Sequence, residues 1–317
     1  SVVLQGALDV QPHAECEITM EDLSNVLVSR GYQEAVTYSF VDPDLQEKIN
    51  PQLSPVPLAN PISSEMAEMR TSLWPGLLTA VQHNLRRQKS RLRFFEHGLR
   101  FYSREGEIHQ EMMLAGVITG SRLPEHWDGK GDAVDFFDLK GDVQALFSLT
   151  GHARDFSFAA AEHPALHPGQ SAQIRCGDRP VGWIGRVHPQ LVDHLDLNPD
   201  SLVFELEYVA LATGQLAEFK PISRFPSIRR DLAVVVDDTL SAADLQAAVQ
   251  QTAGDLLQEL RIFDIYRGKG IETGRKSIAF GLILQDYSRT LTEQDIEGVV
   301  TQVTDQLGKE FGATLRD

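Results

Sequence analysis

Hydrophobic positions in the last third of the chain follow two periods, and their order predicts a complete small domain. Apolar runs with a two-residue period predict four strands, at 232–236, 260–266, 276–284 and 313–316. Ser241 and Thr292 are good N-cap residues for two helices whose apolar positions recur every three to four residues. The resulting strand-helix-strand-strand-helix-strand order predicts a ferredoxin-like βαββαβ fold, with both helices on one face of a four-stranded sheet.

The alternation also assigns side chains to the two faces of that sheet. The apolar set should cover the helices: Leu232, Val234, Val236, Phe263, Ile265, Ile278, Phe280 and Leu282. Ile262 falls on the opposite face, which is otherwise made mostly of small residues with one aromatic and one carboxylate: Ala233, Asp264, Tyr266, Ser277, Ala279 and Gly281. Small residues let a flat base approach, a tyrosine offers a stacking surface, and Asp264 or Ser277 can pair with a base edge. The same pattern fits an ordinary half-exposed sheet, and composition does not separate the two interpretations.

The segment 19–212 is predicted to form a larger mixed α/β domain. Thr19 and Asp22 form a helix-start signature, and an apolar stripe with Pro75 in the first turn predicts a long helix over 72–87. Strands are predicted at 34–41, 92–102, 112–120, 171–175, 180–187 and 202–208, and further helices at 137–149 and 189–195. Short connections favour antiparallel pairing. The expected organisation is a tail at 1–18, this module, a linker at 213–221 and the small domain at 222–317.

Charge limits how the chain can bind a nucleic acid. The chain has 317 residues, enough for two or more domains, and its net charge of −16 argues against a broad nonspecific grip on nucleic acid. From Ile222 onward, 11 Lys and Arg stand against 15 Asp and Glu, so even the small domain carries −4. RNA recognition by this domain must therefore be local and geometric.

Two further features of the sequence bear on its location. Cys16 and Cys176 are too few for a disulfide framework and form no C-x-x-C motif, which fits a reducing cytosol. No apolar run approaches membrane-spanning length and no signal-peptide pattern opens the chain. Because the chain starts at Ser1 without a Met, we expect it to be part of a longer protein.

Four motifs carry a specific resemblance in the small domain. They are Arg224-Phe-Pro-Ser-Ile-Arg-Arg-Asp231, Phe263-Asp-Ile-Tyr-Arg-Gly268, Lys276-Ser-Ile-Ala-Phe280 and Arg289-Thr-Leu-Thr-Glu293. In this order they resemble the anticodon-binding domain that ends the bacterial phenylalanyl-tRNA synthetase β subunit. The resemblance implies that the sheet face holds an anticodon base, at Ala233, Asp264, Tyr266 and Ser277. Contacts to the RNA backbone are expected from Arg229, Arg230, Arg267, Lys276 and Arg289, each of which also fits a solvated surface charge.

The larger module resembles the same subunit, in its catalytic-like part. The resemblance is carried by Tyr38-Ser-Phe40, Asn60-Pro-Ile-Ser-Ser-Glu65, Met69-Arg-Thr-Ser-Leu73, Pro75-Gly-Leu-Leu78, Phe95-Glu96, Asp138-Leu-Lys-Gly-Asp142, His167-Pro-Gly-Gln-Ser-Ala172 and Gly182-Trp-Ile-Gly-Arg-Val-His-Pro189. That part is similar in fold to class II aminoacyl-tRNA synthetase cores, built on an antiparallel sheet, so the fold class expected for the whole chain is α+β. The helix 72–87 takes the place of the first class II motif, which builds subunit interfaces. Leu73, Leu77 and Val81 are therefore expected to contact a catalytic α subunit, with plain core packing as the alternative.

The chemistry of an active class II core is missing from the sequence. An active core places an arginine two residues before a glutamate on ATP, whereas Arg93-Phe-Phe-Glu96 is off by one, which sends the guanidinium to the opposite face of a strand. Gly182-Trp-Ile-Gly-Arg186 has the wrong spacing for the late glycine-rich motif. We therefore expect no catalytic residue and no cofactor bound by this part, while the resemblance implies that the whole enzyme uses ATP and Mg²⁺.

No metal site is expected. His163 and His167 are four residues apart, but Pro164 and Pro168 disfavour the helix that would bring them together. An acidic cluster at Asp135, Asp138 and Asp142 fits a capped helix start better than a magnesium site.

Three functional hypotheses remain. The favoured one is a part of the β subunit of phenylalanine–tRNA ligase: a catalytically silent core that assembles with the catalytic α subunit in an α2β2 enzyme, and a C-terminal domain that binds the anticodon of tRNA-Phe, in the cytoplasm and away from membranes. The second is a free-standing class II-like enzyme that activates an amino acid with ATP. The third, by fold analogy alone, is an amino-acid-sensing ferredoxin-like module.

Overall fold

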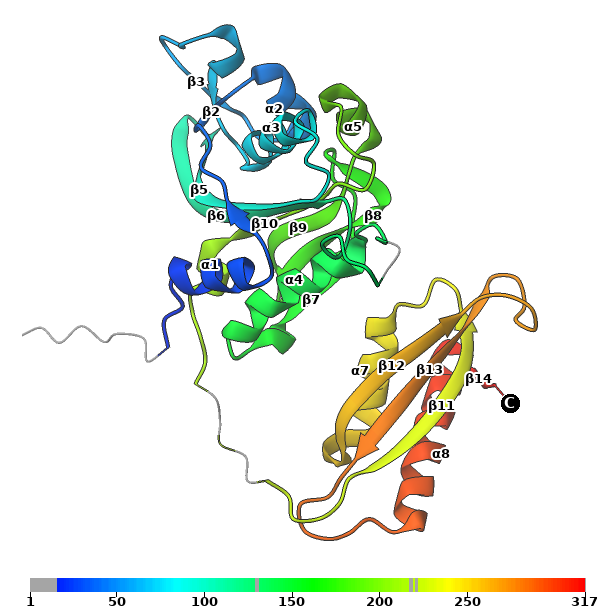
Figure 1. Cartoon of the computed structure of the whole chain (residues 1–317). Helices are drawn as coiled ribbons and strands as arrows, with labels where there is room; N and C mark the ends of the chain where they lie inside the picture. The colour runs from blue at the N-terminus through cyan, green and yellow to red at the C-terminus, as the bar shows by residue number, and fades with distance from the viewer. Residues whose placement is uncertain (1–15, 129–130, 217–218, 220–221, 317) are drawn as a thin grey trace, which may run out of the picture. The chain divides into compact units, whose positions relative to one another are not determined.

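The computed structural model describes residues 16–128, 131–216, 219 and 222–316, and the chain divides into two compact units, Ser1–Ala217 and Glu218–Asp317 (Figure 1). The predicted tail at 1–18 and linker at 213–221 fall partly outside the described residues. Within them, Glu17 bridges to Thr213, and Ile18 is 5% exposed in the core of the first unit. Glu17 and Ile18 thus belong to the first unit, because Glu17 pairs with Thr213 near the end of that unit and Ile18 is buried in its core.

A seven-stranded sheet forms the centre of the first unit (Figure 1). Its strands, in spatial order, are β1 (Gln33–Glu34), β5 (Leu92–Arg104), β6 (Glu107–Thr119), β10 (Leu202–Glu207), β9 (Arg179–Val187), β8 (Leu166–Cys176) and β7 (Phe156–Ala160). All neighbours pair antiparallel except β1, which runs parallel to β5. The antiparallel sheet within an α+β fold agrees with the sequence prediction.

Helices cover both faces of this sheet (Figure 1). One face packs against α1 (Met20–Ser29) and α4 (Phe136–Leu149), and the other against α2 (Pro43–Ile49), α3 (Trp74–Leu85) and α5 (Pro189–Leu195). Phe94 and Phe95, neighbours on β5, enter the two different cores, as the alternation of side chains along a strand requires. Thr19 and Asp22 form the capping box that the sequence predicted for the first helix.

The strand predicted at 34–41 is wrong. Only its ends are strands: β1, and β2 (Phe40–Val41), which belongs to a separate sheet with β4 (Glu68–Met69) and β3 (Val56–Pro57). Between them Thr37 turns to the Glu96 carboxylate, to which its amide and hydroxyl donate at 3.2 and 2.8 Å. Directly after β2, α2 begins, with Asp42 as N-cap and Pro43 in the first turn.

Short elements complete the first unit. They are the 3-10 helices η1 (Ser64–Met66) and η2 (Ala153–Asp155) and the four-residue helix α6 (Tyr208–Leu211).

The second unit has the predicted ferredoxin-like order. It consists of β11 (Ile228–Asp237), α7 (Ala242–Ala253), the 3-10 helix η3 (Gly254–Leu256), β12 (Leu257–Tyr266), β13 (Arg275–Leu284), α8 (Glu293–Phe311) and β14 (Thr314–Leu315). The sheet order is β12-β13-β11-β14, antiparallel throughout. Ser241 and Thr292 cap the helices as predicted, and both helices share one core with the sheet, so the other face of the sheet is left open by them.

The face assignment along β12 needs one correction. A β-bulge lies between Ile262 and Asp264, so the strand gains an unpaired residue at that point. Ile262, predicted to face away from the helices, packs against their core, whereas Phe263, predicted to face them, is 51% exposed. Ile265 returns to the register of buried Ile278 but stays 46% exposed at the edge of the sheet. The assignments along β11 and β13 hold, with Val234, Val236, Ile278, Phe280 and Leu282 all buried in the helix-side core.

Candidate nucleic-acid interface

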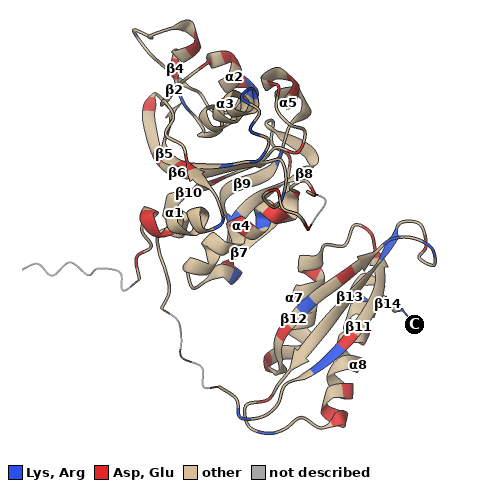
Figure 2. Ribbon diagram, viewed as in Figure 1, with Lys and Arg blue, Asp and Glu red and all other residues tan. Residues whose placement is uncertain are grey.

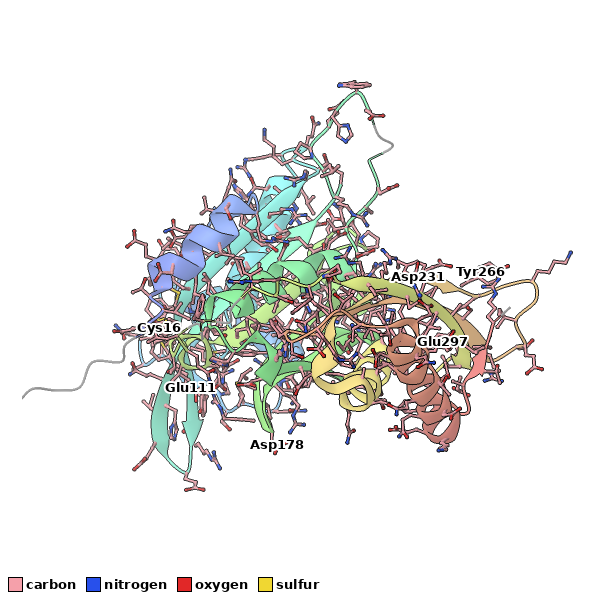
Figure 3. All side chains as sticks on the ribbon, turned by 90° about the horizontal axis from the view of Figure 1, so that it is seen from below. Cys16, Glu111, Asp178, Asp231, Tyr266 and Glu297 are labelled. Atoms are coloured by element: carbon pink, nitrogen blue, oxygen red, sulfur yellow. The ribbon has the colours of Figure 1, made fainter. Side chains whose placement is uncertain are left out.

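The open face of the second unit is built around small residues in register. Ala233 on β11 pairs with Ala279 on β13, and Asp264 on β12 pairs with the same Ala279. Asp231 and Tyr266, labelled in Figure 3, lie on the side of the strands turned away from α8, the helix that carries Glu297. The centre of this face is therefore flat, with larger side chains around it.

Two aromatic rings on this face each carry a guanidinium. Arg316 lies 4.8 Å from the ring centroid of Tyr266, and Arg229 lies 5.4 Å from that of Phe263. The Tyr266 hydroxyl donates to the carbonyl of Lys269 at 3.2 Å, which fixes the ring against the following hairpin. Planar cations over planar rings show that both rings accept flat, electron-poor partners. Phe263 was missed in the sequence because a bulge cannot be read from alternation.

Gly281 leaves part of the open face free of a side chain. A side chain there would meet Asp231 Oδ1 at 2.8 Å and Arg229 Nε at 2.9 Å, so it would displace the ion pair that these two residues form at 2.7 Å. The same Arg229 guanidinium lies over the Phe263 ring. The small residues of this face thus have a packing role that the sequence alone did not indicate.

The four residues predicted to hold a base differ in how accessible they are. Asp264 is exposed, and Ala233 and Tyr266 are half-buried. Ser277 pairs with Tyr266 but is only 2% exposed, so its hydroxyl is not presented to a ligand in this conformation. Three of the four therefore remain available as a recognition surface.

The predicted backbone cations are already engaged inside the unit. Arg229 pairs with Asp231, Arg230 with Glu293, Arg267 with Asp238 at 2.7 Å and Arg289 with Asp295 at 2.7 Å. These arginines keep side-chain exposures of 38–57%, so a phosphate has access to them by replacing a carboxylate. The Arg289 guanidinium, with the Thr292 cap, holds the pKa of Asp295 well below its ordinary value.

Lys276 is placed differently from the prediction. It is 8% exposed, and its ammonium donates to the carbonyls of Asp238 and Leu240, at 2.7 Å each. Burial lowers its pKa. This lysine ties down the loop between β11 and α7 and is not offered to a phosphate, because its strand position points to the helix side, paired with Val236.

The subunit contacts predicted on α3 are also corrected. Leu73, Leu77 and Val81 are each 0% exposed and belong to the core of the first unit. Their apolar stripe packs against the chain's own sheet and neighbouring helices, which was the alternative interpretation. An apolar stripe has the same spacing in either case, so the sequence could not decide between them.

The arginine and glutamate that were compared with an ATP site face opposite ways. Arg93 donates to Asp142 of α4 at 2.9 Å, on one side of the sheet. Glu96 accepts from Arg70 at 2.6 Å in an ion pair whose side chains are 5% and 4% exposed, on the other side. The late glycine motif lies on β9, where a side chain at Gly182 would meet the Glu205 carbonyl at 2.1 Å, so this glycine serves strand packing.

No group of three or more His, Cys, Asp or Glu in the part of the chain that the structure covers is arranged to hold a metal ion. His163 lies between Trp74 and Trp183, with ring centroids 5.2 and 4.9 Å away, and burial lowers its pKa to about 4. Asp135 and Asp138 form the capping box of α4, as predicted for a helix start. Among the described helices, none has the length and apolar character needed to cross a membrane.

Comparison with known proteins agrees with these features. The family model described as "Phenylalanyl tRNA synthetase beta chain CLM domain" matches residues 1–208, and "Ferredoxin-fold anticodon binding domain" matches residues 223–316. The phenylalanine–tRNA ligase beta subunit of Pseudomonas syringae pv. tomato is 48% identical over 312 residues, which cover 98% of this chain and 39% of that protein. The beta subunit from Aliivibrio fischeri is 46% identical over 315 residues, covering 98% and 40%.

The chain therefore spans about two fifths of the length of these relatives. Among solved structures, a pyrrolysyl-tRNA synthetase from Desulfitobacterium hafniense overlays with a TM-score of 0.47 at 17% identity, over 60% of this chain and 63% of that one. The family match covers well over half of the residues. The chain belongs to the phenylalanyl-tRNA synthetase β chain family.

Proposed function

We propose that the chain is part of the β subunit of a phenylalanine–tRNA ligase and that its second unit binds an anticodon base of tRNA-Phe. The observation that carries this proposal is the open sheet face, on which the rings of Tyr266 and Phe263 each have a guanidinium over them, 4.8 and 5.4 Å from the ring centroid. A nucleobase has the same planar shape and exchanges for such a cation without loss of stacking. Asp264, exposed beside the rings, accepts hydrogen bonds from the amino group of a base.

The first unit, in this proposal, scaffolds the enzyme and performs no chemistry. Arg93 and Glu96 are each paired with a residue of the chain itself and lie on opposite faces of the sheet, so the two side chains cannot act together on one ATP as they do in an active class II core. Amino-acid activation, with ATP and Mg²⁺, is then the task of a catalytic α subunit in an α2β2 assembly in the cytoplasm. This part of the proposal rests on the family relationship.

Base stacking is tested by titrating the chain with a tRNA-Phe anticodon stem-loop. Tyr266→Ala and Phe263→Ala should each weaken binding by about 1–3 kcal/mol, the range for removing one stacking ring. Tyr38→Ala, which removes a 67% exposed tyrosine from the other unit, serves as the matched control and should leave affinity unchanged. Equal affinities for all three variants and the unchanged chain would argue against the open face as the RNA site.

The two competing functions are tested separately. ATP–pyrophosphate exchange by this chain alone, without an α subunit, would support a free-standing activating enzyme, and we expect none. Binding of phenylalanine but not of the stem-loop would support an amino-acid sensor. Co-purification with an α subunit, followed by tRNA charging, tests the proposed assembly.

A further inference from the structure

The turn between α3 and β5 is strongly basic, in contrast to the chain as a whole. No acidic residue occurs between Glu68 and Glu96, while that stretch includes Arg86, Arg87, Lys89, Arg91 and Arg93. The basic residues of the turn can be followed in Figure 2. Of these five, only Arg93 forms an ion pair with any residue that the structure describes. In the second unit, by comparison, the exposed arginines proposed for RNA contact are paired with carboxylates.

Next to this turn lies a hollow of about 440 Å³ lined by arginines. We call it the arginine pocket and define it by Arg30, Arg91, Arg93 and Arg122, with Phe137 at its rim. Arg30 follows α1, Arg91 immediately precedes β5, Arg93 lies at the start of β5, and Arg122 follows β6. Elements distant in the sequence therefore bring four guanidiniums together.

The carboxylates of the pocket do not balance these charges. Asp142 is shared by Arg30 and Arg93, whose nitrogens lie 2.5 and 2.9 Å from its two oxygens. Arg122 pairs with Asp135 at 3.4 Å and with Asp138 at 2.9 Å, and both carboxylates also cap α4. Four guanidiniums thus meet three carboxylates, and Arg91 has no carboxylate partner within the described residues.

In two of the guanidiniums the Nε also lacks a hydrogen-bond acceptor, although Arg91 and Arg93 each donate a terminal nitrogen to the Arg122 carbonyl, at 3.3 and 3.4 Å. The Arg93 side chain is 8% exposed, and its Nε is buried without a partner in the described structure. The Nε of Arg91 is likewise buried and unpartnered among the residues described. Burial, and then repulsion from Arg93, lowers the pKa of Arg91. Arg91 and Arg93 thus carry positive charge that the carboxylates of the pocket do not balance, and an anion in the hollow would form charge-assisted hydrogen bonds with their guanidiniums.

We propose that the arginine pocket binds a phosphate group of a nucleotide, and that its source is an RNA strand. The volume fits a nucleotide-sized ligand, and Phe137, 72% exposed, offers a ring on which its base can stack. Arg86, Arg87 and Lys89 are exposed and shortly precede Arg91 in the same turn, where they can contact further phosphates of a strand. A free nucleotide needs the pocket but not the turn. The choice of RNA rests on the proposed function, because it takes tRNA as the partner of the protein.

The test compares Arg91→Gln with Arg154→Gln in the whole chain. Arg154 is an exposed arginine of the same unit with no ion pair among the described residues, so the control removes the same charge elsewhere. Binding of a tRNA-Phe transcript is measured between about 50 and 200 mM salt. Arg91→Gln should weaken binding about tenfold and make the slope of log affinity against log salt shallower by about one. Arg154→Gln should change affinity by less than about twofold, as expected for a charge that makes no phosphate contact.

A second variant and a second ligand keep the outcomes distinct. Arg87→Gln removes an exposed cation of the turn that donates to the His83 carbonyl within the same helix end, so the variant should keep its fold. It should weaken tRNA binding while leaving ATP binding unchanged. ATP binding that depends on Arg91, with tRNA binding unaffected, would support the phosphate site with a free nucleotide as its source.

Three further results complete the test. If Arg91→Gln and Arg154→Gln behave alike towards both tRNA and ATP, the proposal is overturned. It is equally overturned if Arg91→Gln impairs only association with an α subunit, since the surface is then a protein contact. Arg91→Gln should weaken tRNA binding to the same extent in a Tyr266→Ala background, because the two sites lie in different units. The anticodon proposal is tested independently, by the effect of Tyr266→Ala alone on tRNA binding.

Discussion

The sharpest stability prediction concerns Asp142, a buried carboxylate that joins three segments of the first unit. It accepts from Arg30, from Arg93 and from the Tyr32 hydroxyl, at 2.5, 2.9 and 2.7 Å. Its side chain is 5% exposed and that of Arg93 is 8% exposed, so water cannot replace the interaction. Asp142→Asn keeps the shape of the side chain but removes its charge.

The expected cost follows from that burial. Removing one partner of a buried ion pair typically costs about 3–5 kcal/mol, because the other charge is left uncompensated. Here Arg93 bears most of this cost, since the Arg30 side chain is 40% exposed and water can solvate it. Against a total stability of about 5–15 kcal/mol, the change should be large.

The assay is urea unfolding followed by tryptophan fluorescence. All three tryptophans of the chain, Trp74, Trp127 and Trp183, lie in the first unit, so the signal reports on that unit alone. With a slope of about 1–3 kcal/mol per molar urea, Asp142→Asn should lower the midpoint by at least about 1 M. Asp178→Asn, at an exposed position, is the matched control and should stay within about 0.5 kcal/mol.

A double variant tests whether the uncompensated charge of Arg93 causes the loss of stability. Arg93→Met in the Asp142→Asn background removes the uncompensated charge, so it should restore part of the lost stability. A midpoint for Asp142→Asn equal to that of the control, or no recovery on adding Arg93→Met, would show that the buried charge pair does not stabilise the unit as described.

Two more predictions concern a buried histidine and a helix cap. The pKa of His163 is about 4 in the folded protein and 6.5 when free, so folding favours the neutral imidazole. The first unit should therefore be most stable above pH 6.5, and its free energy of unfolding should fall by about 2–3 kcal/mol as the pH is lowered to 4. Urea midpoints by tryptophan fluorescence should show this loss, and His163→Gln should remove it; a pH dependence that survives the substitution assigns the effect to other groups. Thr292→Ala removes the N-cap of α8 and should cost the second unit about 1 kcal/mol, measured by hydrogen exchange of the α8 amides; unchanged protection would contradict the cap's role.

Local features of this protein were readable from the sequence. The caps at Thr19, Ser241 and Thr292 and the alternation along β11 depend only on neighbours within a few residues, and each appears in the structure as predicted. The strand order of the ferredoxin-like unit followed from them, because its short connections leave few topologies. The same local alternation placed Tyr266 and Asp264 on the open face of the sheet, where the structure also has them.

Tertiary structure decided what the candidate sites contain. The bulge that turns Phe263 onto the open face arises from the pairing of β12 with β13, which no local period records. Asp142 meets Tyr32 across 110 positions of sequence and Arg93 across 49, and burial of Lys276 depends on loop carbonyls some 36–38 positions away. Charges are paired by proximity in space, so the sequence determined which ionisable groups exist, and only the fold decided which of them are neutralised and which remain to bind a ligand.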